Sequence, residues 1–400
     1  MRCGLLLFIC ASVCLLSTTD SGAESFPLPS GGDNVVGELR YVEVRSGESL
    51  VDIARDFNLG YDQIVRTNPT LNRWVPDPGT KVLLPHRYIL VGNSRRGIVL
   101  NIAELRLYFY PPTLKGDVPR VITHPVSIGR MDWRTPLGTT SVTKKERDPP
   151  WRPPPSIRRE HALDGDPLPE VIPGGSPDNP LGRFALRLGF PSYLIHGVDE
   201  RKAYGIGMRV THGCVRMYPE DIESLFAVVP VGTPVMIVNE PIKLGRQGDS
   251  VLLEVHQPLE EGEDETAPEA PHLSVEEVMA FVRRRLPSGV TFDEDLVAKI
   301  AEEGNGIPTE IARAPLTLAG VPMARPEVLP TGQSQLQKPR QKPQSALDEE
   351  YERAVSRYLT ESDTPTSVER EATKIEPRRT TSRPRKATLP DVQRYVEDHY

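Results

Sequence analysis

The chain has 400 residues, of which 38% are hydrophobic, and it carries a formal net charge of −7 at pH 7. This length exceeds one ordinary domain and predicts two or three domains with buried cores. The negative charge lies mostly in residues 257–400, whereas residues 1–256 are close to neutral, which excludes the basic face of a nucleic-acid-binding protein.

The first 23 residues have the pattern of a secretory signal peptide. Arg2 precedes an apolar run over residues 4–16, and Ser21-Gly22-Ala23 supplies small residues for cleavage. The apolar run is too short to span a membrane comfortably. We therefore expect residues 1–23 to be removed on export.

Residues 41–85 predict a small α+β domain behind a short flexible lead. The lead, residues 24–39, is rich in Gly, Pro and Ser. An alternating strand begins at Tyr41, a helical apolar spacing follows Ser49, a second helix stops before Pro69, and a last turn leads into a strand. The predicted order is strand, helix, helix, strand.

Residues 97 to about 256 predict a mainly β region. Alternating apolar residues favour a hairpin within residues 98–109 and strands at FALRLG and SYLIHG. One helix is expected at PEDIESLFAVV, where Pro219 suits the first turn. Residues 148–181 carry so many prolines and glycines that we expect no regular structure there, but a long loop that is either functional or disordered.

Residues 257–400 are expected to form an acidic, Pro-rich and partly helical extension. Within it, residues 315–345 are rich in Pro and Gln and predict disorder. We find no catalytic pattern in this extension. Two capping boxes predict two helices, Ser274 with Glu277 and Thr291 with Glu294.

Cys214 is the feature of the sequence that most needs an explanation. The other three cysteines lie inside the predicted signal peptide, so export leaves this one alone in an oxidising compartment, without a partner for an internal disulfide. Three explanations remain open. They are a small buried apolar residue, a zinc ligand together with His196 and His212, and a reactive thiol.

The neighbours of Cys214 favour the reactive thiol. Either His196 or His212 offers the base that a catalytic cysteine needs. Gly213 allows a sharp turn whose backbone N–H groups can stabilise an oxyanion. Arg216 adds positive charge, which favours a thiolate and suits a substrate carboxylate. The same residue types fit a zinc site, but zinc motifs usually show paired ligands at short spacing.

The sequence around this cysteine resembles a known family. His196-Gly197, followed by GIGMRVTHGCVRM, is similar to the signature of YkuD-type L,D-transpeptidases, and the likeness covers residues 98–238 through VLNIAELRLYFYPP, PVSIGRMDWRTPLGTTSV and NPLGRFALRLG. Residues 41–85, with VRSGESL, TNP and PGTKVLLP, resemble a LysM module, which binds the glycan of peptidoglycan or chitin. The signal peptide, the LysM-like module and the PPW insert resemble most the ErfK/YbiS/YcfS/YnhG group of Gram-negative bacteria. Thr211 stands where many members have Ser, and the acidic tail after residue 257 departs further from the group.

The resemblance implies a fold and a reaction. Residues 97–240 should form a YkuD-like catalytic domain, a mixed β-sandwich or barrel. Cys214 should attack a peptidoglycan tetrapeptide stem, release D-alanine and hold the acyl group as a thioester. His196 should act as general base and acid, with a backbone carbonyl as the third member of the site.

The resemblance also implies roles for the neighbouring residues. The N–H groups of Gly213 and Cys214 are the candidates for the oxyanion hole. His212, Arg216 and Gly197 should line the active site. The thioester route implies no metal and no organic cofactor.

The acyl acceptor decides the biological role, and three acceptors remain open. The ErfK-like resemblance favours a lysine of an outer-membrane lipoprotein. A second stem would give a 3→3 cross-link, and water would make the enzyme an L,D-carboxypeptidase. A non-catalytic LysM wall-binding protein and a zinc hydrolase of the wall are the competing classes. With the export signal, the resemblance implies a periplasmic protein whose partner is peptidoglycan.

Overall fold

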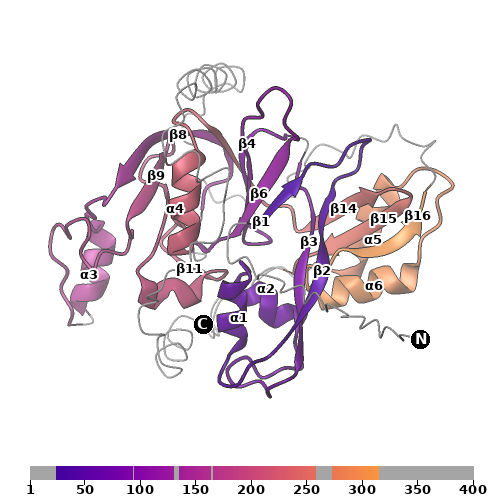
Figure 1. Ribbon diagram of the computed structural model, residues 1–400, viewed down its shortest axis with the longest axis horizontal. Helices are drawn as coiled ribbons and strands as arrows, with labels where there is room; N and C mark the ends of the chain where they lie inside the picture. Colours follow the sequence, from indigo (N-terminus) through magenta and orange to yellow (C-terminus); the bar gives the residue numbers. More distant parts are fainter. Residues whose placement is uncertain (1–23, 93, 130–134, 164, 258–272, 315–400) are drawn as a thin grey trace, which may run out of the picture.

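The structure, a computed structural model, describes residues 24–92, 94–129, 135–163, 165–257 and 273–314 (Figure 1). The predicted signal peptide and the predicted disorder over residues 315–345 lie outside the described residues. Within the described ranges, no helix is both long enough and apolar enough to cross a membrane.

A mixed nine-stranded sheet forms the largest unit of the described residues. Its strand order is β1-β6-β5-β4-β13-β8-β9-β10-β12, and the neighbours β4/β13 and β10/β12 are parallel while the others are antiparallel. Apolar side chains such as Leu100, Phe109 and Ile195 are fully buried in its core. The strands are β1 (Glu24–Pro27), β4 (Gly97–Asn101), β5 (Arg106–Tyr110), β6 (Arg120–Pro125), β8 (Gly138–Arg147), β9 (Phe184–Leu188), β10 (Leu194–His196), β12 (Val215–Arg216) and β13 (Pro234–Val238).

Two smaller elements complete this unit next to β12. The short strands β7 (Ile128–Gly129) and β11 (Arg209–Thr211) pair in parallel. Helix α4 (Pro219–Val228) packs against β9 and buries Ile222 and Leu225, and it begins at Pro219 as expected. The mainly β expectation for the catalytic region is therefore confirmed.

A second unit has the predicted order of strand, helix, helix, strand. Strand β2 (Val35–Glu43) pairs with β3 (Lys81–Ile89), and helices α1 (Leu50–Asp56) and α2 (Tyr61–Thr67) lie between them in sequence. Ser49 caps α1 by accepting from the N–H of Asp52, whose side chain accepts in return. In Figure 1 these two helices lie below the large sheet, near its centre.

The expected flexible lead over residues 24–39 is wrong. Strand β1 joins the edge of the large sheet beside β6, and β2 begins at Val35, six residues before the expected start at Tyr41. Gly37 has φ +72°, and a Cβ there would clash with the carbonyl of His86 on the paired strand. This glycine therefore permits a close strand pairing, where composition alone predicted a loop.

A third unit joins residues on both sides of the acidic linker. Strands β14 (Ile242–Gln247), β15 (Ser250–Val255) and β16 (Thr309–Arg313) form one antiparallel sheet, covered by α5 (Val275–Arg285) and α6 (Glu294–Glu303). The strands over 242–255 lie at the end of the region predicted to be mainly β, and they share a core with the segment after 273.

The two expected helices of this unit exist, but their caps differ from the expectation in one case. Ser274 and Glu277 form the predicted capping box. The box of Thr291 with Glu294 is wrong, because Asp293 caps α6 by accepting from the N–H of Leu296. Asp at the N-cap position satisfies the same free N–H groups that a Thr would.

The insert over residues 148–181 also departs from the expectation of no regular structure. Helix α3 (Pro155–Leu163) lies within it and starts at a proline, which is tolerated in the first turn of a helix. Asn179 is buried, and its side-chain amide donates to the carbonyls of Pro149 and Pro173. The insert is therefore held at its base by the Asn179 side chain and by a backbone bridge between Trp151 and Ile172.

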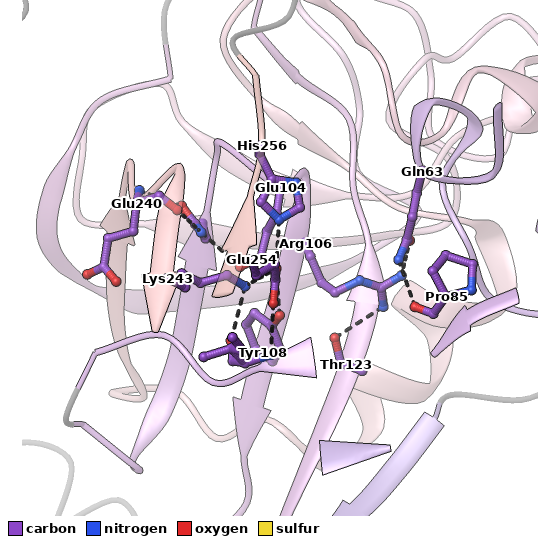
Figure 2. A network of polar contacts seen from close by, with 12 residues as sticks. Gln63, Pro85, Glu104, Arg106, Tyr108, Thr123, Glu240, Lys243, Glu254 and His256 are labelled. Atoms are coloured by element: carbon purple, nitrogen blue, oxygen red, sulfur yellow. Dashed lines mark hydrogen bonds and ion pairs between the residues drawn. The ribbon is translucent and has the colours of Figure 1, made fainter. Parts of the chain in front are cut away.

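Buried polar contacts join the three units (Figure 2). The ammonium group of Lys243, in the third unit, lies 2.7 Å from a carboxylate oxygen of Glu104, in the unit of the nine-stranded sheet. It lies 2.5 Å from a carboxylate oxygen of Glu254, in the third unit itself. Arg106, also fully buried, donates to the side chain of Gln63 in the second unit at 2.6 Å. The units are thus fixed to one another by charged groups that are shielded from water.

The same cluster contains an arrangement of possible metal ligands. Glu104, Glu254 and His256 offer ligand atoms within 4.8 Å of one another, and they are the one such trio in the described part of the chain. Lys243 already places its positive charge between the two carboxylates. A residue of the chain itself therefore offsets part of the negative charge of the two carboxylates.

Candidate active site

The parallel pairing of β10 with β12 brings the predicted site residues together. Ile195 lies opposite Val215, and His196 lies opposite Arg216. Cys214 directly precedes β12, so the alternation of side chains places it on the same face as His196 and Arg216. The structure therefore brings the histidine, the cysteine and the arginine to one end of these two strands.

Cys214 lies directly before β12, and its surface is partly exposed. Its Sγ atom is 3.7 Å from the carbonyl oxygen of Ser192, which has a left-handed backbone with φ +69°. The thiol therefore lies against the loop that leads into β10, the strand that ends at His196.

His196 is buried, with only 3% of its surface exposed. Its Nδ1 atom lies 2.6 Å from the carbonyl oxygen of Gly197. A carbonyl can only accept, so this contact assigns the proton to Nδ1. A backbone carbonyl against the histidine is the kind of third member that the resemblance implies, and it places Gly197 in the site through its oxygen.

Burial controls the protonation of both groups. Burial, together with the nearby Arg216 guanidinium, lowers the pKa of His196 to about 3. Burial also raises the pKa of the Cys214 thiol above its usual value, although the Leu194 backbone and the Arg216 charge act in the opposite direction. The resting site therefore favours a neutral thiol and a neutral imidazole, not the thiolate expected from the sequence.

Two threonines hold the turn that carries Cys214. Gly213 has φ +99°, a conformation that favours glycine. The Thr211 hydroxyl donates to the carbonyl of Cys214 at 2.6 Å and accepts from the N–H of Gly213 at 3.2 Å. The Thr135 hydroxyl donates to the carbonyl of Gly213 at 2.9 Å.

This arrangement separates the two candidates for the oxyanion hole. The Gly213 N–H already donates to Thr211. Within the described residues no hydrogen bond from the Cys214 N–H is found, so this group is the better placed of the two to meet an oxyanion. His212 lies in the same turn and is partly buried.

The geometry also bears on the zinc alternative. A zinc site needs ligand atoms that converge within a few ångströms. Among the described residues, the ligand atoms of His196, His212 and Cys214 do not form such a group. These three side chains are therefore not arranged to share one cation.

Two residues of the site were missed by the sequence reasoning. Ser127 is fully buried, and its backbone exchanges two hydrogen bonds of 2.9 Å with Arg216. Thr135 fixes Gly213, as described above. Both residues lie in the stretch PVSIGRMDWRTPLGTTSV, which carried part of the family resemblance, so that stretch held a signal although their roles did not follow from it.

Comparisons with known proteins agree with this architecture. The family model of the L,D-transpeptidase catalytic domain (YkuD) matches residues 95–237, and the family model of the LysM domain matches residues 42–85. The probable L,D-transpeptidase YcfS of Escherichia coli strain K12 is 36% identical over 297 residues, which are 73% of this chain and 89% of the relative.

Two further matches are another relative in sequence and a solved structure. The probable L,D-transpeptidase YbiS of the same organism is 39% identical over 257 residues, or 63% of this chain and 81% of the relative. A crystal structure of L,D-transpeptidase 3 from Mycobacterium tuberculosis is 21% identical, covers 42% of this chain and 72% of that chain, and has a TM-score of 0.27. The chain therefore belongs to the L,D-transpeptidase family and combines a YkuD catalytic domain with a LysM domain.

Proposed function

We propose that this chain is an L,D-transpeptidase that carries the acyl group of a peptidoglycan tetrapeptide stem on Cys214. The observation that carries the proposal is the placement of Cys214 and His196 on one face of two paired strands, with the imidazole proton held by the Gly197 carbonyl. A nucleophile beside an oriented base is the general arrangement of covalent acyl transfer.

In the first half of the reaction, the thiol attacks the carbonyl at the L-centre of meso-diaminopimelate. His196 takes the thiol proton as the sulfur–carbon bond forms, and the Cys214 N–H stabilises the oxyanion. The carbon–nitrogen bond to D-alanine then breaks, and the imidazolium returns its proton to the departing nitrogen. The thioester remains on Cys214.

In the second half, an amine attacks the thioester. His196 removes a proton from this amine, the carbon–sulfur bond breaks, and the thiol is restored with that proton. Both halves begin and end with neutral groups, which suits a buried site where a separated ion pair is costly.

We propose a lysine of an outer-membrane lipoprotein as the preferred acceptor, with the periplasm as the place of the reaction. The acceptor is the one that the resemblance of the sequence to the ErfK-like group favours, and the signal-like N-terminus supports the periplasm. The LysM domain would bind the glycan and so raise the local concentration of stems. The catalytic domain would act on the peptide and the LysM domain on the sugar of the same partner.

The experiment that tests the proposal uses purified disaccharide-tetrapeptide as donor. The full chain is incubated in three reactions, which contain the donor at low concentration, the donor in excess so that a second stem can act as acceptor, and the donor with a lipoprotein C-terminal peptide that ends in lysine. The products are identified by mass spectrometry. We expect loss of D-alanine and a donor–peptide conjugate, both absent for Cys214→Ala and unchanged by a chelator.

Each other outcome selects a different function. A 3→3 dimer without the conjugate would replace the lipoprotein by a second stem, and a tripeptide alone would indicate a carboxypeptidase. Activity that is lost with the chelator would support a zinc hydrolase. No turnover by the wild type would support a wall-binding protein.

A further inference from the structure

The LysM domain packs against the segment that leads into the Cys214 turn. The first two backbone N–H groups of α2, those of Tyr61 and Asp62, donate to the carbonyls of Ile206 and Gly207 at 2.8 and 3.3 Å. These carbonyls lie between the 3₁₀ helix Glu200–Gly205 and strand β11, which ends at Thr211. Backbone hydrogen bonds thus join the two domains only a few residues before the nucleophile.

Two glycines make this contact very close. A Cβ atom on Gly60 would lie 2.9 Å from the Cα of Gly207, which is shorter than an ordinary van der Waals contact. Gly207 has φ +92°, and a Cβ there would lie 2.3 Å from the Cα of Gly60. The two backbones therefore touch at positions where a larger residue would force the domains apart.

An apolar cluster spans the same contact. Val51 and Tyr61 of the LysM domain pack with Tyr204, Met208 and Val210 of the catalytic domain, and Met208 is fully buried. Because the members of one cluster come from both domains, the LysM domain completes the burial of residues 204–210.

Polar groups hold both flanks of the contact. Arg55 of α1 pairs with Glu200 at 2.7 Å, before the turn, and with Glu220 at 3.0 Å, after it. The hydroxyl of Tyr218 donates to the carbonyl of Leu59 at 3.0 Å, and the side chain of Asn58 donates to Asp221 at 2.7 Å. The LysM domain therefore contacts the chain on both sides of Cys214.

Ser127 connects this contact to the active site. Its hydroxyl donates to the carbonyl of Gly205 at 2.7 Å and accepts from the N–H of Gly207 at 3.1 Å. Its backbone exchanges two hydrogen bonds with Arg216, the residue opposite His196. A displacement of residues 205–207 would thus reach β12 through a single buried serine.

We propose that the LysM domain is a structural part of the catalytic site, in addition to any role in glycan binding. It positions residues 204–211, and through them Cys214, with Gly60 and Arg55 as positioning residues. This inference rests on the proposed thiol mechanism. It predicts that the LysM contact acts on kcat, even with a substrate that carries no glycan.

The test measures D-alanine release from a soluble, glycan-free stem tetrapeptide by the full chain. In Gly60→Ala the added methyl group pushes residue 207 away, while residue 60 keeps an ordinary backbone conformation. Because small misplacements of reacting groups can lower rates by about 100-fold, we expect kcat to fall by roughly 10- to 100-fold. KM should change by less than about threefold, because a misplaced thiol weakens the transition state and leaves substrate binding nearly unchanged.

Arg55→Ala provides a second variant that adds no atoms and cannot create a clash. It should lower kcat on the same substrate, and Arg55→Lys should restore part of the loss by keeping the charge. Arg45→Ala is the matched control, because Arg45 is an exposed arginine of the same domain. The alkylation rate of Cys214 and the retention on insoluble peptidoglycan are measured for every variant.

The results separate three outcomes. Reduced kcat in Gly60→Ala and Arg55→Ala, with glycan retention and KM unchanged, supports the inference. Folded variants with wild-type kcat on the glycan-free stem would overturn it and leave the LysM domain as an anchor only. A wild-type chain that releases no D-alanine from any stem would instead contradict the proposed function itself.

Discussion

Burial is the largest influence on the pKa of both residues proposed to carry the chemistry. It lowers the pKa of His196 to about 3 and raises that of Cys214, so each group is held in its neutral form. Arg216 is a secondary influence that opposes burial at the cysteine and adds to it at the histidine. The Arg216 charge therefore favours the neutral form of His196 and the thiolate form of Cys214.

This balance predicts the pH dependence of the enzyme. Because the folded pKa of His196 lies well below 6.5, the base stays unprotonated from about pH 4 upward, and kcat/KM should show no inflection near pH 6.5. Alkylation of Cys214 by iodoacetamide should keep rising up to at least pH 9, because burial delays formation of the thiolate. A plateau of alkylation below pH 7 would contradict the neutral pair.

Replacing Arg216 by glutamine removes the charge and should move both pKa values upward. The acid limb of kcat/KM should then shift toward pH 6.5, and alkylation at pH 8 should become slower, by about tenfold for each pKa unit. Arg216→Lys keeps a positive charge and serves as the control. An unchanged profile in Arg216→Gln would show that this residue has no electrostatic role at the site.

The Thr211 hydroxyl makes a separate prediction about the turn. Thr211→Val removes a donor to the Cys214 carbonyl and an acceptor for the Gly213 N–H, and each lost buried hydrogen bond costs about 1–3 kcal/mol. We expect at least a tenfold loss of kcat, whereas Thr211→Ser keeps the hydroxyl and should retain most of the activity. Equal rates for the valine and serine variants would show that the turn does not need this hydroxyl.

The sequence indicated the candidate site residues, but not the residues that hydrogen-bond to them. His196, Gly213 and Cys214 lie in short segments whose residue types indicate chemistry directly. Ser127 and Thr135 each bond to residues 78 or more positions away, and nothing in their own segments reveals that contact. Long-range hydrogen bonds of this kind follow from the folded topology.

At the scale of elements, local sequence patterns predicted the secondary structure of a segment better than they predicted its partners in the fold. Residues up to about 256 were predicted to be mainly β, but that prediction did not indicate that residues 242–255 pair with β16 and not with the large sheet. The prolines of the insert suggested irregular structure, yet Pro155 begins α3. Likewise, Asp293 caps α6 where Thr291 was expected, because neighbouring polar residues compete for the same role.

The junction between the catalytic unit and the third unit makes a prediction about stability. Lys243 is almost completely buried between Glu104 and Glu254. Lys243→Met leaves two buried carboxylates without their cation, and we expect the free energy of unfolding at pH 7 to fall by about 3–5 kcal/mol. The loss should shrink at pH 4, because Lys243 lowers the pKa of Glu254 and protonation of Glu254 removes the charge that the lysine offsets.

Denaturant unfolding followed by circular dichroism measures this loss. Lys299→Met is the matched control, because that lysine forms only an exposed pair with Glu303 on α6 and should change stability by less than about 1 kcal/mol. Equal stabilities for the two variants would show that the buried cluster contributes no more than a surface ion pair.

At the scale of the whole molecule, the three units are fixed together by buried contacts. Arg106 and Lys243 each reach from one unit into another (Figure 2), and the LysM domain lies against the segment before Cys214. A LysM domain held in this way would present its glycan at a set distance from the thiol, whereas a tethered module would not. The binding of sugar and the chemistry on peptide are therefore expected to be coupled.

The central claim is that Cys214 holds the acyl group as a thioester, and intact-protein mass spectrometry tests it most directly. The full chain is mixed briefly with disaccharide-tetrapeptide, quenched in acid and weighed, and the modified peptide is located by digestion. We predict an added mass equal to the donor minus D-alanine, placed on Cys214 and absent in Cys214→Ala. Continued release of D-alanine by the Cys214→Ala protein would contradict the account.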